Sequence, residues 1–154
     1  MNKKLGFTLI EVLTVVMILS ILTAFAVPQY TKSIQRANAA NALISVKTIF
    51  DSAKRRKSTS SSWPTNFNEL DVELADIDSR NVMGEFSYSL DAANETVSAC
   101  RTANNAPSDS TFCITAHYRR NGIRDVYTCT YATEKFQYLC ESLGTCTGTV
   151  CIIK

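Results

Sequence analysis

The sequence has very few of the residues that build catalytic or metal centres. It contains one histidine, His117, and no Cys-x-x-Cys pair, so the usual ligand sets for zinc are missing. A Gly-x-Ser-x-Gly motif and a glycine-rich phosphate loop are also missing. His117 alternates with Phe112 and Ile114, which favours an exposed strand residue over a general base. We therefore expect no catalytic residue, metal or cofactor, and no enzymatic activity.

The chain also lacks a large excess of charge. The formal net charge is +2, from 16 basic and 14 acidic side chains. The two excess positive charges are Lys3 and Lys4, and without them the basic and acidic side chains are equal in number. Bulk charge therefore gives no support to a nucleic-acid partner.

A long apolar run follows these lysines. Between Phe7 and Val27 the polar residues are only Thr8, Glu11, Thr14, Ser20 and Thr23. A helix over this run is ~30 Å long, about the thickness of a bilayer's hydrocarbon core. Because Lys3 and Lys4 lie only on its N-terminal side, that end is expected in the cytoplasm. The sequence predicts a single membrane span, with the bulk of the chain outside the cytoplasm.

Glu11 is the unusual residue of this run. A carboxylate costs about 2.5 kcal/mol or more at the bilayer centre, and somewhat less near the interface, so it calls for a partner or a function. No Lys or Arg lies within two turns on its C-terminal side. A cut after Gly6 would remove Lys3 and Lys4 and create a new cation, the α-amine of Phe7.

The stretch Gly6-Phe7-Thr8-Leu9-Ile10-Glu11-Val12-Leu13 follows a short basic leader and precedes an apolar run closed by Pro28. It resembles the N-terminus of type IV pilins and the related pseudopilins, and the resemblance extends to about Lys57. The resemblance implies that a prepilin peptidase cleaves between Gly6 and Phe7 and methylates the Phe7 amine. It also implies that Glu11 pairs with the Phe7 amine of a neighbouring subunit, and that the helix is curved or melted around Pro28. The leader length and Phe7 resemble the type IVa class.

A secretory signal peptide is the first alternative for the same stretch. The lysines would form its n-region, Phe7 to Thr23 its h-region, and Ala24-Phe25-Ala26 its cleavage site. A glutamate inside an h-region is unfavourable, and this apolar run is longer than such regions usually are. A plain single-span anchor is the second alternative.

The pattern becomes amphipathic after Pro28, which removes a helical hydrogen bond. Apolar residues then recur with helical spacing to about Lys57: Ala39, Ala42, Leu43, Val46, Ile49, Phe50 and Ala53. We expect this face to be buried against a globular domain.

The predicted helix ends on a basic turn, Lys54-Arg55-Arg56-Lys57, which complements the helix dipole. A DNA-binding or inter-subunit patch is the alternative. Residues 65–85, which follow it, contain one basic residue, Arg80, and six acidic ones: Glu69, Asp71, Glu73, Asp76, Asp78 and Glu85. The glycine-pinned loop of an EF-hand is missing, so a solvated acidic segment is favoured over a calcium site. The opposite signs suggest that the two segments meet, within one subunit or between neighbours.

From Phe86 onward the apolar residues no longer follow helical spacing and instead recur at every second position. Three such runs predict antiparallel strands: Phe86 to Leu90, Phe112 to Tyr118 and Val126 to Tyr131. Asn121-Gly122 favours a hairpin between the second and third. A fourth strand around Thr96 to Cys100 or Phe136 to Cys140 remains open.

Asn94-Glu95-Thr96 has the form of a glycosylation acceptor, a pattern that often recurs by chance.

All cysteines lie in the last third of the chain: Cys100, Cys113, Cys129, Cys140, Cys146 and Cys151. In an extracytoplasmic chain this clustering favours disulfides, with fifteen pairings that the sequence does not resolve. Cys100 with Cys113 is a first guess, because the strands that they border could pair. The resemblance also implies a C-terminal disulfide, although three would be more than pilins usually have.

These features predict an α+β fold, the pilin lollipop: a long N-terminal α-helix packed by its second half on an antiparallel β-sheet, with a disulfide-tied C-terminal region. The expected domains are a leader (1–6), a transmembrane and filament-core helix (7–27), the amphipathic half of the helix (28–57) and a globular head (58–154).

By the resemblance, the protein is expected to be the structural subunit of a type IVa pilus, a homo-oligomeric helical filament. Its expected partners are the prepilin peptidase, the pilus assembly machinery of the bacterial inner membrane and minor pilins. The precursor would be a single-pass inner-membrane protein, and the assembled filament extracellular. Adhesion, twitching motility and DNA uptake remain open as roles of the filament. The alternatives are a pseudopilin of a type II secretion system and, from other classes, a secreted disulfide-rich binding domain or an anchored enzyme.

Overall fold

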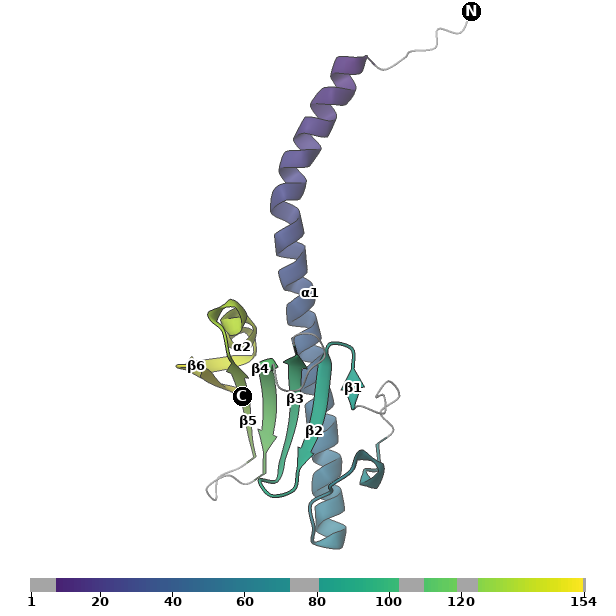
Figure 1. Ribbon diagram of the computed structural model, residues 1–154, viewed down its shortest axis with the longest axis vertical. Coiled ribbons are helices and arrows are strands. Elements are labelled where there is room, and N and C mark those ends of the chain that lie inside the picture. Colours follow the sequence, from purple (N-terminus) through teal and green to yellow (C-terminus); the bar gives the residue numbers. More distant parts are fainter. Residues whose placement is uncertain (1–7, 73–80, 103–109, 119–124, 154) are drawn as a thin grey trace, which may run out of the picture. The chain divides into compact units, whose positions relative to one another are not determined.

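The computed structural model describes residues 8–72, 81–102, 110–118 and 125–153. The elements follow in this order: α1 (Leu9–Ser60), η1 (Phe67–Glu69), β1 (Val82–Met83), β2 (Phe86–Asp91), β3 (Thr96–Thr102), β4 (Ser110–His117), β5 (Val126–Tyr131), η4 (Glu134–Phe136), α2 (Gln137–Leu143), β6 (Gly144–Thr147) and β7 (Val150–Ile153) (Figure 1). The chain divides into two compact units, Met1–Gln35 and Arg36–Lys154. The predicted α+β class is confirmed.

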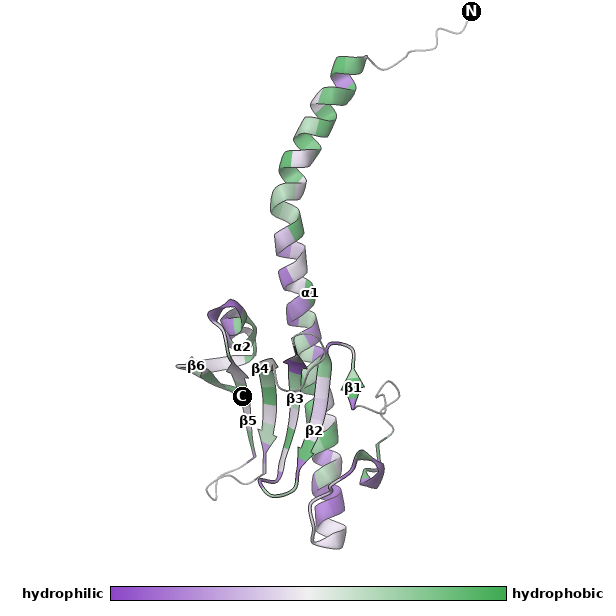
Figure 2. Cartoon of the chain, viewed as in Figure 1, coloured by the Kyte–Doolittle hydropathy of each residue, from purple (hydrophilic) through white to green (hydrophobic). Residues whose placement is uncertain are grey.

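The first unit holds the N-terminal part of α1. This part is long and apolar enough to cross a membrane, and hydrophobic residues dominate it in Figure 2. Its hydroxyl side chains bond to backbone carbonyls one turn back: Thr14 to Glu11, Ser20 to Met17 and Thr23 to Leu19, at 2.7–2.9 Å. These bonds satisfy the hydroxyl groups without any partner outside the helix. The helix continues through Pro28.

The second unit begins within α1 and contains the hydrophobic core. The helix buries one stripe of residues there: Ala39, Ala42, Val46, Ile49, Phe50, Ser52 and Ala53. This is the predicted amphipathic face, except that Leu43 is only partly buried and that Ser52 joins it. The stripe packs with the inward side chains of the sheet in a single core cluster.

The sheet has seven antiparallel strands in the order β1-β2-β3-β4-β5-β7-β6. Burial alternates along its central strand β4, where Phe112, Ile114 and Ala116 are at most 1% exposed and the residues between them are half-buried. This alternation places one face of the sheet against the core and leaves the other more open to solvent.

The three predicted strands are confirmed as β2, β4 and β5. Of the two candidate fourth strands, Thr96 to Cys100 is part of β3, whereas Phe136 to Cys140 as a strand is wrong. Phe136 ends η4 and α2 follows it, because Phe136, Leu139, Cys140 and Leu143 have helical spacing, and Leu139 and Cys140 are buried. The predicted turn at Asn121-Gly122 lies outside the described residues.

The C-terminal hairpin of β6 and β7 was not predicted from the sequence, and each of its strands has only four residues. Thr147 pairs with Val150 across a tight turn, in which Gly148 has a φ of 66°. At Gly144 a Cβ atom would collide with the Ile152 backbone carbonyl, so only glycine allows β6 to approach β7 this closely.

Three disulfides tie the second unit: Cys100–Cys113 between β3 and β4, Cys129–Cys140 between β5 and α2, and Cys146–Cys151 between β6 and β7. Cys100 and Cys113 are direct partners in the register of β3 and β4, which explains their pairing.

Candidate functional site

Glu11 lies in the first turn of α1, where the helix dipole favours a negative charge. Its Oε2 atom accepts hydrogen bonds from the backbone N–H and the Oγ1 of Thr8, at 3.4 and 3.3 Å. Both distances are at the long end of the range for hydrogen bonds, so the contacts are weak. Within the part of the chain that the structure describes, no cationic side chain pairs with Glu11.

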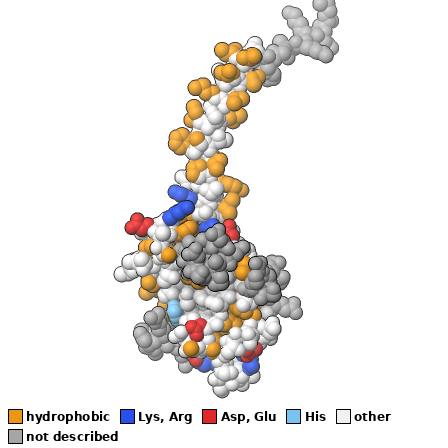
Figure 3. Space-filling model, viewed as in Figure 1, with side chains coloured by type: hydrophobic (Ala, Val, Ile, Leu, Met, Phe, Trp, Pro, Cys, Tyr) orange, Lys and Arg blue, Asp and Glu red, His pale blue; other side chains and the backbone are white. Residues whose placement is uncertain are grey.

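The surface around Glu11 is apolar on every side of the helix. Large apolar side chains between 41% and 83% exposed extend along this part of α1: Leu9, Ile10, Val12, Leu13, Val15, Val16, Met17, Ile18, Leu19, Ile21, Leu22, Phe25, Val27, Tyr30 and Ile34. Figure 3 shows hydrophobic side chains along the same stretch. A helix that is apolar all round is normally covered by lipid or by other helices. Glu11 is therefore a carboxylate on a helix surface that is expected to be buried in lipid or against other helices.

The other residues of the predicted N-terminal site are placed as follows. Gly6 and Phe7, the predicted cleavage and methylation positions, lie outside the described residues. Pro28, the predicted kink, lies inside α1. The structure therefore describes Glu11 and Pro28 but not the groups that the cleavage would create.

The predicted basic turn, residues 54–57, is neutralised within the second unit, and because α1 continues to Ser60 only Lys57 belongs to the last turn of the helix. The four cations of the basic turn form these ion pairs: Lys54 with Asp51 (2.8 Å) and Asp125 (2.9 Å), Arg55 with Asp71 (2.7 Å), Arg56 with Glu69 (3.4 Å), and Lys57 with Glu95. The expected meeting of this turn with the acidic segment is thus confirmed within one subunit for Glu69 and Asp71. Carboxylate partners beside all four cations weaken their attraction for a nucleic acid, which disfavours the DNA-binding alternative.

The ion pair between Arg55 and Asp71 also has the clearest effect on a pKa. The Arg55 guanidinium donates two hydrogen bonds to the carboxylate, at 2.7 and 2.8 Å, and Ser52 Oγ donates a third. Together they hold the pKa of Asp71 well below its usual range. Asp71 returns a bond through its backbone N–H to Ser52 Oγ at 3.1 Å, so this contact fastens the acidic segment to α1.

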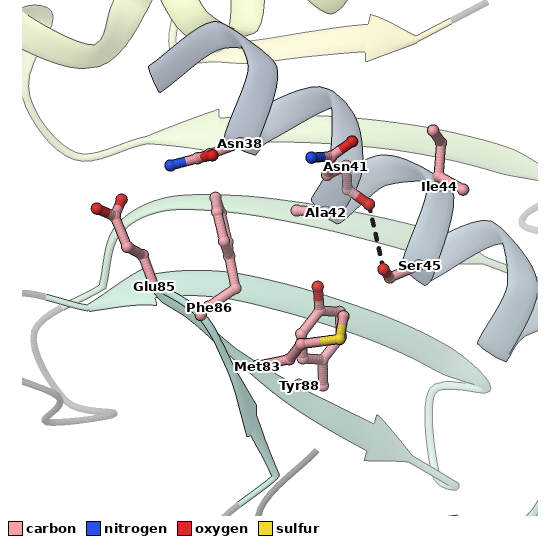
Figure 4. A pocket seen from close by; sticks show the side chains of 10 residues that line it. Asn38, Asn41, Ala42, Ile44, Ser45, Met83, Glu85, Phe86 and Tyr88 are labelled. Atoms are coloured by element: carbon pink, nitrogen blue, oxygen red, sulfur yellow. Dashed lines mark hydrogen bonds between the residues drawn. The ribbon is translucent and has the colours of Figure 1, made fainter. Parts of the chain in front are cut away.

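An open cavity of about 440 Å³ lies between α1 and the strands β1 and β2 (Figure 4). Its lining is mainly apolar with a few amide, hydroxyl and carboxylate groups: Asn38, Asn41, Ala42, Ile44, Ser45, Met83, Gly84, Glu85, Phe86 and Tyr88. Burial raises the pKa of the Tyr88 hydroxyl, against a hydrogen bond to Ser45 that lowers it. The described lining contains neither a histidine nor a pair of carboxylates, so it offers no general acid–base arrangement.

His117 lies on the face of β4 opposite Phe112 and Ile114, as predicted, but it is half-buried rather than exposed. Its Nε2 atom is 3.0 Å from Thr128 Oγ1 on β5, so the ring fills the space beside a neighbouring strand. Across the described residues, no group of three or more His, Cys, Asp or Glu side chains could hold a metal ion.

A family model supports the reading of the N-terminus. Residues 1–27 match the prokaryotic N-terminal methylation motif. The match covers Gly6, Phe7 and Glu11 but not the second compact unit. Together with the apolar start of α1, the motif fits a membrane-anchored precursor. The first 27 residues therefore carry the prepilin-like signal of type IV pilins and pseudopilins, and the motif supports the assignment of this chain to that class.

Proposed function

We propose that this protein is the structural subunit of a type IVa pilus and polymerises through the N-terminal part of α1 into a surface filament. The observation that carries the proposal is the Glu11 carboxylate on a helix surface that is otherwise apolar and exposed. Covering this surface with neighbouring helices is favourable for the apolar side chains and costly for an unpaired carboxylate. Assembly therefore requires a cation that reaches Glu11.

The cation proposed is the α-amine of Phe7. Cleavage between Gly6 and Phe7 creates this amine, and methylation leaves it basic, so it stays positively charged at neutral pH. We infer that Glu11 pairs with the Phe7 amine of a neighbouring subunit, which offsets the desolvation of both charges in the filament. The same pairing would set the axial register between adjacent helices.

The decisive experiment replaces Glu11 by Ala. This variant makes the span more apolar, so membrane insertion and cleavage should be normal while filaments become few or short. Glu11→Gln keeps the shape and one acceptor but loses the charge, so its filament yield should be intermediate. Thr14→Ala is the matched control, because its hydroxyl bonds only to the Glu11 carbonyl within the helix and its loss should leave assembly unchanged. Filaments of normal number and length from Glu11→Ala would contradict the proposal.

Two measurements separate this function from its alternatives. The mass of the mature protein should correspond to a chain that starts at methylated Phe7, whereas a start at Val27 would indicate a secreted domain with a cleaved signal peptide. Deleting the protein should remove surface fibres. Intact fibres together with a defect in protein export would instead indicate a pseudopilin of a type II secretion system.

The cellular partners follow from the same proposal. The prepilin peptidase would process an inner-membrane precursor whose N-terminus is cytoplasmic, and the assembly machinery would transfer mature subunits, with minor pilins, to an extracellular filament. In this arrangement residues 7–27 form the filament core, residues 28–57 link it to the head, and residues 58–154 form the head.

A further inference from the structure

Three of the cysteines are neighbours in one row that crosses the adjacent strands β5, β7 and β6. Cys129 of β5 is the direct partner of Cys151 of β7, and Cys151 is the direct partner of Cys146 of β6. The row continues to Ile114 of β4, a core residue that is opposite Cys129. Directly opposite residues share a face of the sheet, with Cβ atoms ~4.5–5.5 Å apart. Cys140 of α2 joins the row through its disulfide to Cys129, so two disulfides are neighbours.

Access to these four cysteines is uneven. Cys129, Cys140 and Cys151 are 0% exposed, whereas Cys146 is half-buried and lies on the edge strand of the sheet. A thiolate must reach a sulfur atom directly to attack a disulfide. Of the two neighbouring bridges, a dissolved thiol can therefore reach Cys146–Cys151 at Cys146, while Cys129–Cys140 is shielded at both sulfur atoms.

We propose that these four cysteines form a relay for thiol–disulfide exchange with a dithiol. The dithiol attacks at Cys146, and the Cys151 thiolate that is released opens the buried Cys129–Cys140 bridge. The relay goes beyond the proposed filament function and does not depend on it. As a result, an attack at the edge strand β6 breaks the disulfide that links α2 to β5.

The exchange balances in three steps. One thiolate of the dithiol bonds to the Cys146 sulfur, and the Cys146–Cys151 bond breaks with its electron pair on Cys151. The Cys151 thiolate bonds to the Cys129 sulfur and expels Cys140, which takes up a proton. The second thiolate of the dithiol attacks the first thiol's sulfur, closes the oxidised dithiol and releases Cys146 as a thiol. The dithiol loses two electrons, and the protein ends with a Cys129–Cys151 bridge and two thiols.

The third disulfide serves as an internal reference. Cys100 and Cys113 are opposite each other next to the core pair Ala99 and Ile114 along the same two strands, so they lie on the other face of the sheet. Both are half-buried. The Cys100–Cys113 bridge is therefore open to direct attack and takes no part in the row.

The test follows the reduction of the folded, full-length mature protein in detergent by limiting dithiothreitol. Free thiols are alkylated at timed intervals and located by peptide mass mapping. We expect label on Cys140 and a cross-linked peptide that contains Cys129 and Cys151. Label confined to Cys146 and Cys151, with no Cys129–Cys151 peptide at any time, would overturn the relay.

Two variants isolate the internal nucleophile. Cys151→Ser keeps Cys146 but removes the attacking sulfur, so labelling of Cys140 should slow at least tenfold. The double variant Cys100→Ser with Cys113→Ser removes the reference bridge and should leave the rate unchanged within twofold. An unchanged Cys140 rate in Cys151→Ser would also refute the relay. If the emission of Trp63 shows that this variant is unfolded, the peptide map of the wild-type protein decides the question alone.

Discussion

Replacing Phe50 is the most direct test of how α1 packs on the sheet. The Phe50 side chain is 0% exposed. Its ring centroid lies 5.7 Å from that of Trp63 and 5.8 Å from that of Tyr127, so it joins α1 to the segment after the helix and to β5. Replacing a buried phenylalanine by alanine removes its transfer free energy and leaves a cavity, at a cost of about 3–5 kcal/mol. We expect Phe50→Ala to lower the free energy of unfolding of the head by this amount.

Urea unfolding of the mature protein in detergent measures this loss. Trp63 is the only tryptophan of the chain and is 5% exposed, so its emission reports on the head alone. With a urea m-value of ~1–3 kcal/mol/M, a loss of about 3–5 kcal/mol should lower the midpoint by about 1–5 M. The matched control is Ile44→Ala on the same helix, where the side chain is 62% exposed and the loss should stay near 0.5 kcal/mol. A loss below ~1 kcal/mol for Phe50→Ala, or one equal to the control, would refute the predicted packing.

Three further predictions use the same unfolding assay. Removing the first disulfide with Cys100→Ser and Cys113→Ser should cost about 2–4 kcal/mol, and a loss below ~0.5 kcal/mol would contradict its structural role. Ser52→Ala should cost about 1–3 kcal/mol, because buried Ser52 bonds to both the carboxylate and the N–H of Asp71. The folded-state pKa of Asp71 is lowered by Arg55, so its contribution should be complete above the ordinary aspartate pKa of about 3.9 and lost as the pH falls through the lowered value. Arg55→Gln should therefore flatten the acid limb of the stability profile, and an unchanged limb would count against this ion pair.

The long helix and three of the strands were predictable because each has a sustained period. The helical spacing from Ala39 to Ala53 matches the buried stripe of α1. The alternation in β4 likewise follows the burial of Phe112, Ile114 and Ala116. Both patterns are long enough to separate a period of 3.6 from one of 2. Glu11, for which we propose a role in assembly, stood out because a carboxylate is rare in an apolar run.

The C-terminal region was harder to predict, for physical reasons. The strands β6 and β7 have four residues each, too few to show a period, and cysteines and threonines supply most of their side chains. The pairing of the cysteines depends on register, which brings Cys146 and Cys151 together only once Gly144 admits the close approach of the two strands. Sequence alone also did not show that Lys57 would meet Glu95, because this contact requires the β2–β3 turn to lie beside the end of α1.

The two compact units differ in what each leaves unsatisfied. In the second unit the four cations at residues 54–57 of α1 all have carboxylate partners. Of its described buried side chains only Trp63 keeps a polar atom, Nε1, without a hydrogen-bond partner. In the first unit the apolar side chains are exposed, and Glu11 has only weak contacts to Thr8. Burial of apolar surface is the main drive for association, and an unpaired carboxylate selects which associations are allowed. The exposed apolar surface and the unpaired carboxylate both lie in the first unit. Substitutions in the core of the second unit should therefore change its stability, and substitutions of Glu11 itself should change assembly.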